Sequence, residues 1–152
     1  MPVPRETKER NYLGLSKGSF FRIPEIKAEI IIIEIFSLYC PPCIKMGPKI
    51  KELYENIEND PDLRNKIKII GIGAGDSLKE VEEFKRITDA PFPLFSDQAF
   101  SIHNAIGEVR TPHFIAIRIN PDRTHQVIYS ESGGFKEPKE FLKLITTDRG
   151  LN

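Results

Sequence analysis

Residues 30–43 read IIIIEIFSLYCPPC, and they join an apolar run directly to the only two cysteines of the chain. The run Ile30–Phe36 is β-branched and almost continuously apolar, which is typical of a strand covered on both faces. Cys40 and Cys43 follow at CxxC spacing, and apolar residues at i, i+3, i+4 and i+7 then predict a helix over 44–59. A dithiol between a strand and a helix start is a site for thiol–disulfide exchange.

The place of Cys40 at the helix start favours its thiolate form. The first N–H groups and the dipole of the helix should lower the pKa of this thiol. Because the thiolate is the attacking species, we expect Cys40 to be the nucleophile and Cys43 the resolving thiol. Pro41 and Pro42 are well tolerated in the first helical positions, and they leave the Cys43 N–H available to the Cys40 sulfur.

Composition describes an ordinary globular chain with no excess charge. The 152 residues are 39% hydrophobic and 29% charged, which favours one domain with a full core. Lys plus Arg and Asp plus Glu each number 22, so the formal net charge is +0. This balance argues against a nucleic-acid partner. The run Ile30–Phe36 is far too short to be an integral membrane segment.

The two ends of the chain differ from its middle. We expect residues 1–18 to form a flexible charged N-terminal tail, residues 19–147 one domain, and residues 148–152 a C-terminal tail. The first 18 residues lack the apolar stretch of a signal peptide. They suit either a cytoplasmic protein or an extracytoplasmic one whose leader has been removed.

Periodicity and turn residues predict the remaining elements. The helix that follows the second strand is capped by Asp76 or Ser77. The expected extended segments are Ser19–Ile23, Glu29–Phe36, Lys66–Ala74, Pro91–Asp97, Phe114–Ile119 and Gln126–Glu131, and the expected helices span 44–59, 77–89, 98–105 and Pro138–Ile145. Strands that alternate with helices predict an α/β fold. Its central mixed sheet has helices on both faces and ends in an antiparallel hairpin.

Four features of this arrangement resemble the thioredoxin superfamily. A strand runs straight into CxxC, and Pro48 stands five residues after the second cysteine, as in the family's kinked active-site helix. Thr111-Pro112 precedes the third long strand, and the chain ends in a hairpin, a glycine and a helix. The resemblance spans roughly 19–145. The long segment 75–109 is similar to the TlpA/ResA-like branch, which is related to the AhpC/TSA and peroxiredoxin-like proteins.

The resemblance implies roles for two residues around the dithiol. Glu34 stands six residues before Cys40, where thioredoxin carries a buried acid that accepts and donates a proton for the resolving cysteine, here Cys43. A lone buried carboxylate should have a raised pKa. The alternative is that Glu34 points to an edge or to a polar partner. Tyr39 occupies the place of the family's tryptophan and offers a similar flat apolar surface.

The resemblance also implies how substrate is bound and which partners are used. Pro112 should be cis and face the dithiol, while the backbone of Thr111 pairs with an extended substrate segment; an ordinary proline at a strand start is the alternative. We expect a monomeric thiol–disulfide oxidoreductase that reduces disulfide-bearing proteins and is itself reduced again by an upstream thiol reductant. It needs no cofactor beyond its own disulfide. TlpA-like members are typically extracytoplasmic.

A thiol peroxidase is the first competing interpretation. Ser37 lies three residues before Cys40, as a peroxiredoxin's Thr or Ser does, and Arg110 could stabilise the thiolate. However, Ile33 stands where a peroxiredoxin has proline, and a second cysteine at CxxC spacing favours exchange with proteins.

A non-catalytic metal-binding module is the second competing interpretation. Zinc needs about four ligands, and only one CxxC exists. His103, His113 and His125 have no ligand spacing to the pair, so we expect no metal. His113 is expected to be a strand residue near the rim of the site.

Overall fold

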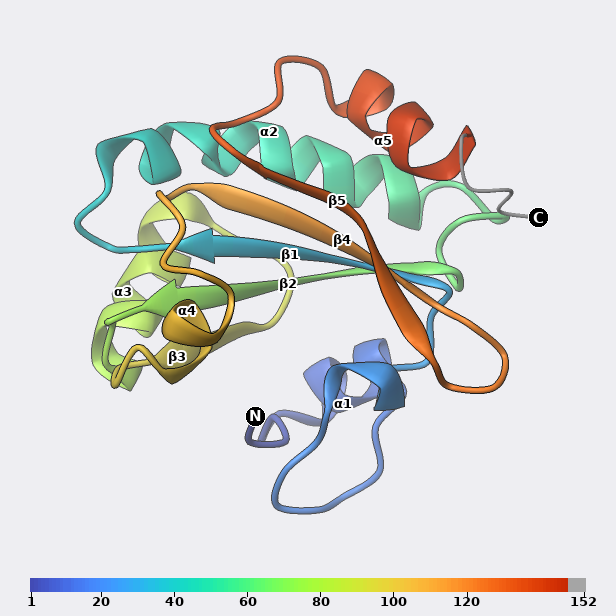
Figure 1. Cartoon of the computed structure of the whole chain (residues 1–152), viewed down its shortest axis with the longest axis horizontal. Coiled ribbons are helices and arrows are strands. Elements are labelled where there is room, and N and C mark those ends of the chain that lie inside the picture. Colours follow the sequence, from blue (N-terminus) through green and yellow to red (C-terminus); the bar gives the residue numbers. More distant parts are fainter. Residues whose placement is uncertain (148–152) are drawn as a thin grey trace.

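A mixed five-stranded β-sheet forms the centre of the molecule (Figure 1). The structure is a computed structural model and describes residues 1–147. In spatial order the strands are β3 (Leu94–Asp97), β2 (Ile67–Ala74), β1 (Ile30–Phe36), β4 (His113–Ile119) and β5 (His125–Ser132). β1, β2 and β3 are parallel, whereas β4 is antiparallel to both β1 and β5. This confirms the expected α/β fold with its final hairpin; the predicted tail at 148–152 lies outside the described residues.

Helices cover both faces of the sheet. They are α1 (Thr7–Leu13), α2 (Pro41–Glu58), α3 (Leu78–Thr88), α4 (Ser101–Ala105) and α5 (Pro138–Thr147), with a 3-10 turn at Ile23–Glu25. Figure 1 shows α2 and α5 side by side over one face, with α1 beyond the other. Right-handed crossovers carry the chain from β1 through α2 to β2 and then through α3 to β3, so α2 and α3 share a face.

The alternation of β1 explains why its sequence is apolar almost throughout. Ile30 and Ile32 pack into a core with α2 and α5, while Ile31, Ile33 and Ile35 pack on the opposite face with the N-terminal segment. Successive strand residues point to opposite faces, and both faces of this strand are covered. The strand therefore serves two cores.

Ser77, rather than Asp76, caps α3. The Ser77 hydroxyl accepts a hydrogen bond from the Glu80 N–H at 3.2 Å, and the Glu80 carboxylate accepts one from the Ser77 N–H at 2.9 Å. This reciprocal capping box satisfies two donors that the first turn would otherwise leave free. Asp76 thereby becomes available for a different contact at the active site.

The N-terminal segment packs on the domain, which corrects the expectation of a separate flexible tail at 1–18. Leu13 of α1 is fully buried in the core. Residues 19–23 are also less extended than expected, since Phe20 forms only an isolated bridge to Pro2 and a 3-10 turn begins at Ile23. The sequence did not predict α1, because this segment is rich in charged residues and very few apolar side chains anchor the helix.

Tyr12 of α1 provides a hydrogen-bond acceptor for a backbone group at the edge of β2. β3 pairs only with Gly71–Ala74, so it leaves the first half of that edge of β2 without a strand partner. There the Tyr12 hydroxyl accepts a hydrogen bond from the Ile69 N–H at 2.8 Å, and the Lys68 ammonium lies 4.4 Å from the Tyr12 ring centroid. A side chain of α1 thus replaces the missing strand partner at this backbone group.

Replacing Tyr12 with phenylalanine should lower the free energy of unfolding by about 1–3 kcal/mol, because the buried Ile69 N–H loses its acceptor. Chemical denaturation followed by circular dichroism measures this change. Tyr54→Phe is the matched control: Tyr54 packs its ring on Tyr12 with centroids 5.8 Å apart, and removing its hydroxyl should change stability by less than about 0.5 kcal/mol. Equal effects of the two variants would contradict this role of the Tyr12 hydroxyl.

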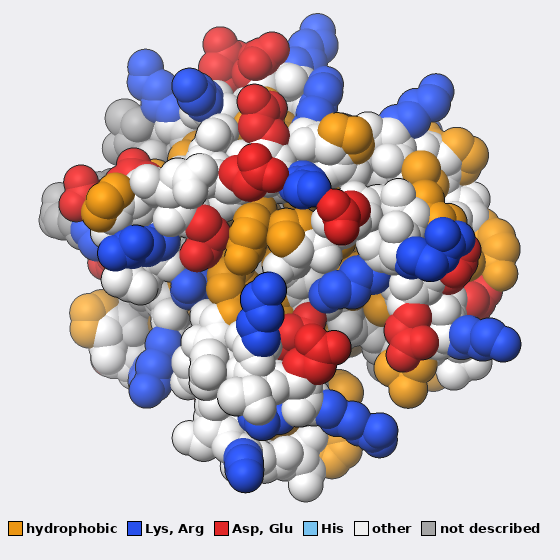
Figure 2. All heavy atoms as spheres, turned by 180° about the vertical axis from the view of Figure 1, so that it is seen from behind, with side chains coloured by type: hydrophobic (Ala, Val, Ile, Leu, Met, Phe, Trp, Pro, Cys, Tyr) orange, Lys and Arg blue, Asp and Glu red, His pale blue; other side chains and the backbone are white. Residues whose placement is uncertain are grey.

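Charges of both signs are interspersed over the surface. On the face shown in Figure 2, acidic and basic side chains alternate around a small central group of hydrophobic ones. No single sign dominates this face, in keeping with the net charge of +0. Among residues 1–147, no helix is both long and apolar enough to span a bilayer.

Candidate active site

The cysteine pair lies at the start of α2 and is present as a disulfide. Cys40 is the N-cap of α2 and Cys43 lies in its first turn, with their Cα atoms 5.3 Å apart. The Cys43 N–H donates to the Cys40 sulfur at 3.3 Å, which confirms that this donor is available. Cys40 keeps 9% of its surface exposed, whereas Cys43 is fully buried. Only the Cys40 sulfur can therefore react directly with a partner protein.

The disulfide has apolar side chains on its inner side and an exposed aromatic residue directly before it. Phe36 of β1 packs below the cysteines together with Val81 and Phe84 of α3. Tyr39 is 74% exposed, and a hydrogen bond from its hydroxyl to the Glu80 carboxylate, together with the charge of that carboxylate, raises the pKa of Tyr39. An exposed aromatic ring directly before Cys40 offers a flat apolar surface to a partner.

Pro41 and Pro42 occupy the first two positions of α2 and are exposed. Proline is suited to these positions because its missing N–H has no partner within the helix. The pair leaves the Cys43 N–H as the first backbone donor of α2. That donor is the one that reaches the Cys40 sulfur.

Asp76 anchors the loop that leads into the cysteines, and sequence reasoning missed this role. The buried Asp76 carboxylate accepts hydrogen bonds from the Leu38 N–H at 2.8 Å and from the Ser37 hydroxyl at 3.3 Å. The Ser37 hydroxyl in turn accepts one from the Tyr39 N–H at 3.2 Å. Burial raises the pKa of Asp76, against the lowering effect of the Leu38 N–H. Asp76 comes two residues after β2, and Leu38 comes two residues after β1. Because β1 and β2 are parallel neighbours, both residues lie at the same end of the sheet, and this adjacency could have predicted their contact.

Replacing Asp76 with alanine should remove this anchor, leave the Leu38 N–H unpaired and destabilise the protein by about 1–3 kcal/mol. The catalytic efficiency of disulfide reduction should fall about tenfold, because the loop no longer holds Cys40 in place. Asp76→Asn keeps an oxygen acceptor and should restore most of both losses. Insulin reduction and chemical denaturation measure the effects; an alanine variant with normal stability and efficiency would contradict the anchoring role.

Glu34 is buried in the middle of the sheet rather than at an edge. It pairs with Gly71 of β2 and Phe114 of β4, and its Oε2 atom has no hydrogen-bond partner in the described part of the chain. Burial raises the pKa of Glu34 to about 8. The alternative of an edge position or a polar partner for this oxygen is thus wrong. The carboxyl group can be neutral or charged near neutral pH, as a proton carrier requires.

A small cavity connects Glu34 with the helix that bears the cysteines. Its walls include Gly47 of α2 and Phe84 and Thr88 of α3. A Cβ atom at Gly47 would lie 3.2 Å from the Thr88 Cβ, so glycine allows the two helices to approach closely. Gly47 lies one helical turn after Cys43 on the same side of α2. Glu34 therefore faces the side of α2 that also carries Cys43.

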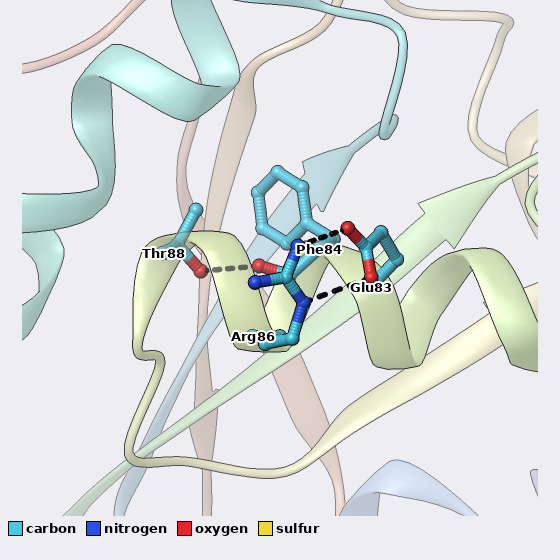
Figure 3. Close-up of polar contacts among 4 residues, drawn as sticks. All are labelled: Glu83, Phe84, Arg86 and Thr88. Atoms are coloured by element: carbon cyan, nitrogen blue, oxygen red, sulfur yellow. Dashed lines mark hydrogen bonds and ion pairs between the residues drawn. The ribbon is translucent and has the colours of Figure 1, made fainter.

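Figure 3 shows the part of α3 that closes this cavity. The Thr88 hydroxyl donates to the Phe84 carbonyl at 2.8 Å, so it is satisfied within its own helix. Arg86 pairs with Glu83 on the exposed side of the helix. The charged side of α3 thus faces solvent, and the wall of the Glu34 cavity remains without charge.

Thr111 and Pro112 lie at the same end of the sheet as the cysteines. The peptide bond between them is cis. Ile35 pairs with His113 in antiparallel register, so Pro112 lies level with Phe36 at the end of β1, and Thr111 lies level with the start of the loop to Cys40. Pro112 is buried, and its carbonyl accepts a hydrogen bond from the Gly133 N–H at 2.8 Å. The structure therefore brings the predicted substrate-pairing segment and the dithiol to one end of the sheet.

His113 is a buried strand residue held between two serines. Its Nδ1 and Nε2 atoms each lie 2.8 Å from a serine hydroxyl, of Ser132 and Ser130 respectively. Because the Ser132 hydroxyl donates to the Arg110 carbonyl, Nδ1 must donate to Ser132, which leaves Nε2 to accept from Ser130. Burial lowers the pKa of His113, in agreement with this neutral ring. It has a structural role in the hairpin.

Comparison with a family model identifies the wider relationship. Residues 12–131 match the AhpC/TSA family. The chain is similar to the thiol-disulfide oxidoreductase ResA of Halalkalibacterium halodurans, with 23% identity over 131 residues that cover 85% of this chain and 69% of that protein. It is also similar to ResA of Bacillus thuringiensis, with 26% identity over 133 residues, 86% of this chain and 71% of that protein.

Solved structures show the same fold. StoA from Bacillus subtilis superposes with a TM-score of 0.62 at 15% identity, covering 79% of this chain and 84% of that one. A secreted Mycobacterium tuberculosis disulfide oxidoreductase homologous to DsbE gives 0.63 at 14% identity, covering 84% and 88%. A thioredoxin-like protein from Aeropyrum pernix gives 0.59 at 16%, covering 80% and 79%. With its thioredoxin-like fold and its Cys40–Cys43 disulfide, the chain belongs to the AhpC/TSA family as a ResA-like thiol–disulfide oxidoreductase.

Proposed function

We propose that this protein reduces disulfide bonds in other proteins. The unequal exposure of the two cysteines carries the proposal, because it gives Cys40 the contact with the partner and Cys43 the intramolecular step. In the reduced protein, the Cys40 thiolate attacks one sulfur of the substrate disulfide, and the other substrate sulfur leaves as a thiolate. Cys43 then attacks the Cys40 sulfur, releases the second substrate thiolate and forms the Cys40–Cys43 disulfide.

Glu34 is the proposed proton acceptor for the Cys43 thiol during this second step. The cavity that Glu34 shares with Gly47, one helical turn after Cys43, its unpaired Oε2 atom and a pKa of about 8 support the assignment. The proton would later return to a thiol when the protein is reduced again. The two electrons come from the dithiol itself, so the cycle needs an upstream thiol reductant and no bound cofactor.

The substrate segment is proposed to lie beside Thr111 in an extended conformation, with Tyr39 against its side chains. Backbone pairing of this kind gives affinity without strict sequence specificity. We further propose an extracytoplasmic location and a monomeric state. The description of the Mycobacterium tuberculosis structural relative as secreted supports the proposed location.

Trapping with a Cys43→Ser variant tests the proposed step. The reduced variant should form a stable mixed disulfide with insulin, because no resolving thiol remains to release it. The matched Cys40→Ser variant should trap nothing, since its remaining thiol is buried. Non-reducing gels and mass spectrometry identify the linked species. Trapping through Cys43, with none through Cys40, would reverse the assignment.

Peroxide reduction is the second candidate because Ser37 lies three residues before Cys40, as a peroxiredoxin's Thr or Ser does. The contacts of Ser37 weigh against it: this hydroxyl donates to Asp76 and accepts from the Tyr39 N–H. Stopped-flow mixing of the reduced protein with hydrogen peroxide should give the slow oxidation of an ordinary thiol. Oxidation that outpaces insulin reduction would favour a peroxidase.

A further inference from the structure

An apolar cavity lies on the face of the sheet opposite α2. Its volume is about 370 Å³, which is within the range of small-molecule sites. The walls come from the sheet, from α4 and from the N-terminal segment; they include Ile33, Ile35, Ile72, Ile102, Ile106 and Val127. Arg22 is the only charged side chain among the described residues that line it. Val127 keeps 59% of its surface exposed, so this wall is only partly covered.

A second, strongly cationic cavity adjoins the first. It has a volume of about 720 Å³ and shares Phe21 and Arg22 with the apolar cavity. Its basic side chains are Lys17, Arg22, Lys27 and Arg123. Within residues 1–147, no carboxylate lies in ion-pair distance of these four groups. Cationic walls around a concave site attract anions even on a protein of zero net charge.

Glu25 does not neutralise this surface. It is the only acidic residue among the described residues that line the cationic cavity, and its carboxylate already accepts a hydrogen bond from the Arg22 backbone N–H at 3.0 Å. Arg123 donates one N–H to the Pro24 carbonyl at 3.0 Å, which fixes its guanidinium at the cavity wall and leaves further donors free. Four cations against one acid leave an excess of positive charge.

We propose that the two cavities together bind an amphipathic carboxylate, with its alkyl chain in the apolar cavity and its carboxylate at Arg22. Arg22 stands where the apolar and cationic walls meet, and guanidinium groups pair with carboxylates through two parallel hydrogen bonds. The chain would cover the exposed apolar surface of Val127. The site is separate from the disulfide, since Cys40 and Cys43 pack with α3 on the other face. The proposal is independent of the redox function.

Titration of the whole protein with sodium dodecanoate, below its micelle-forming concentration, tests the proposal by calorimetry. Saturable binding of one molecule per chain is expected, with a melting temperature that rises with ligand concentration. Acetate has the same head without the chain, and dodecyltrimethylammonium has the same chain with a cationic head. Neither should bind. Equal binding of the cationic amphiphile, or binding to phosphatidylglycerol vesicles without any to dodecanoate, would overturn the proposal.

Two surface variants locate the site. Arg22→Gln removes the carboxylate partner, and Val127→Glu places a negative charge at the rim of the apolar wall. Each should weaken dodecanoate binding about tenfold or more. Arg64→Gln, at an exposed arginine outside both cavities, is the matched control and should leave binding unchanged. Insulin reduction should be unaffected in all three. If the Arg22 and Arg64 variants bind dodecanoate with equal affinity, the site does not lie at Arg22.

Discussion

A Cys40→Ser variant should lose disulfide reduction by at least about a thousandfold, the largest effect expected of any single substitution here. A serine hydroxyl cannot form the mixed disulfide, and the remaining thiol of Cys43 is fully buried. Insulin reduction, followed by turbidity with a small-molecule dithiol as electron source, measures the loss relative to the wild-type protein. The rate of the dithiol alone sets the background.

Folding of the variant is the necessary control for that experiment. Cys40 and Cys43 are joined in the oxidised protein, so the comparison must use the reduced wild-type protein. Far-ultraviolet circular dichroism should be the same for the two proteins. Cys43→Ser should also lose turnover while it still reacts once with substrate. A Cys40→Ser variant that turns over insulin well above background would refute the assignment of the nucleophile.

The second large effect concerns Glu34 and the pH dependence of stability. Burial raises the pKa of Glu34 from an ordinary value near 4.5 to about 8 in the folded protein. Between these two pH values the folded state holds a proton that the unfolded state has released. The contribution of this group to stability is therefore complete below pH 4.5 and is lost as the pH rises through 8. The expected loss is roughly 3–5 kcal/mol.

A Glu34→Gln variant should remove most of this slope and be more stable than the wild-type protein above pH 8. Denaturant unfolding of the oxidised protein at several values from pH 5 to pH 9 measures it. Some slope of the same sign should remain, because burial also raises the pKa of Asp76. Glu83→Gln is the matched control: Glu83 lies on the surface, and its hydrogen bond with Arg86 lowers its pKa, so this variant should keep the wild-type slope. If the free energy of unfolding of Glu34→Gln falls with pH as steeply as that of the wild-type protein, the prediction is wrong.

Strongly periodic segments could be predicted because their signals lie within a few residues. The run Ile30–Phe36 became β1 over its whole length, and the helix after the dithiol became α2. Its start moved from residue 44 to Pro41, since Cys40 serves as the N-cap. The weakly marked α1 was missed, because Tyr12 and Leu13 are anchored by residues far along the chain.

By itself, the sequence determined the chemistry: two cysteines at CxxC spacing, at the start of a helix, with Glu34 in an apolar strand before them. The tertiary structure decided how these groups differ from one another. It buried Cys43 and left Cys40 accessible, and it closed a cavity over Glu34. It also brought Asp76 to the Leu38 N–H, 38 residues away. Exposure, desolvation and such long-range hydrogen bonds depend on which elements pack together, and local residue patterns do not specify that packing.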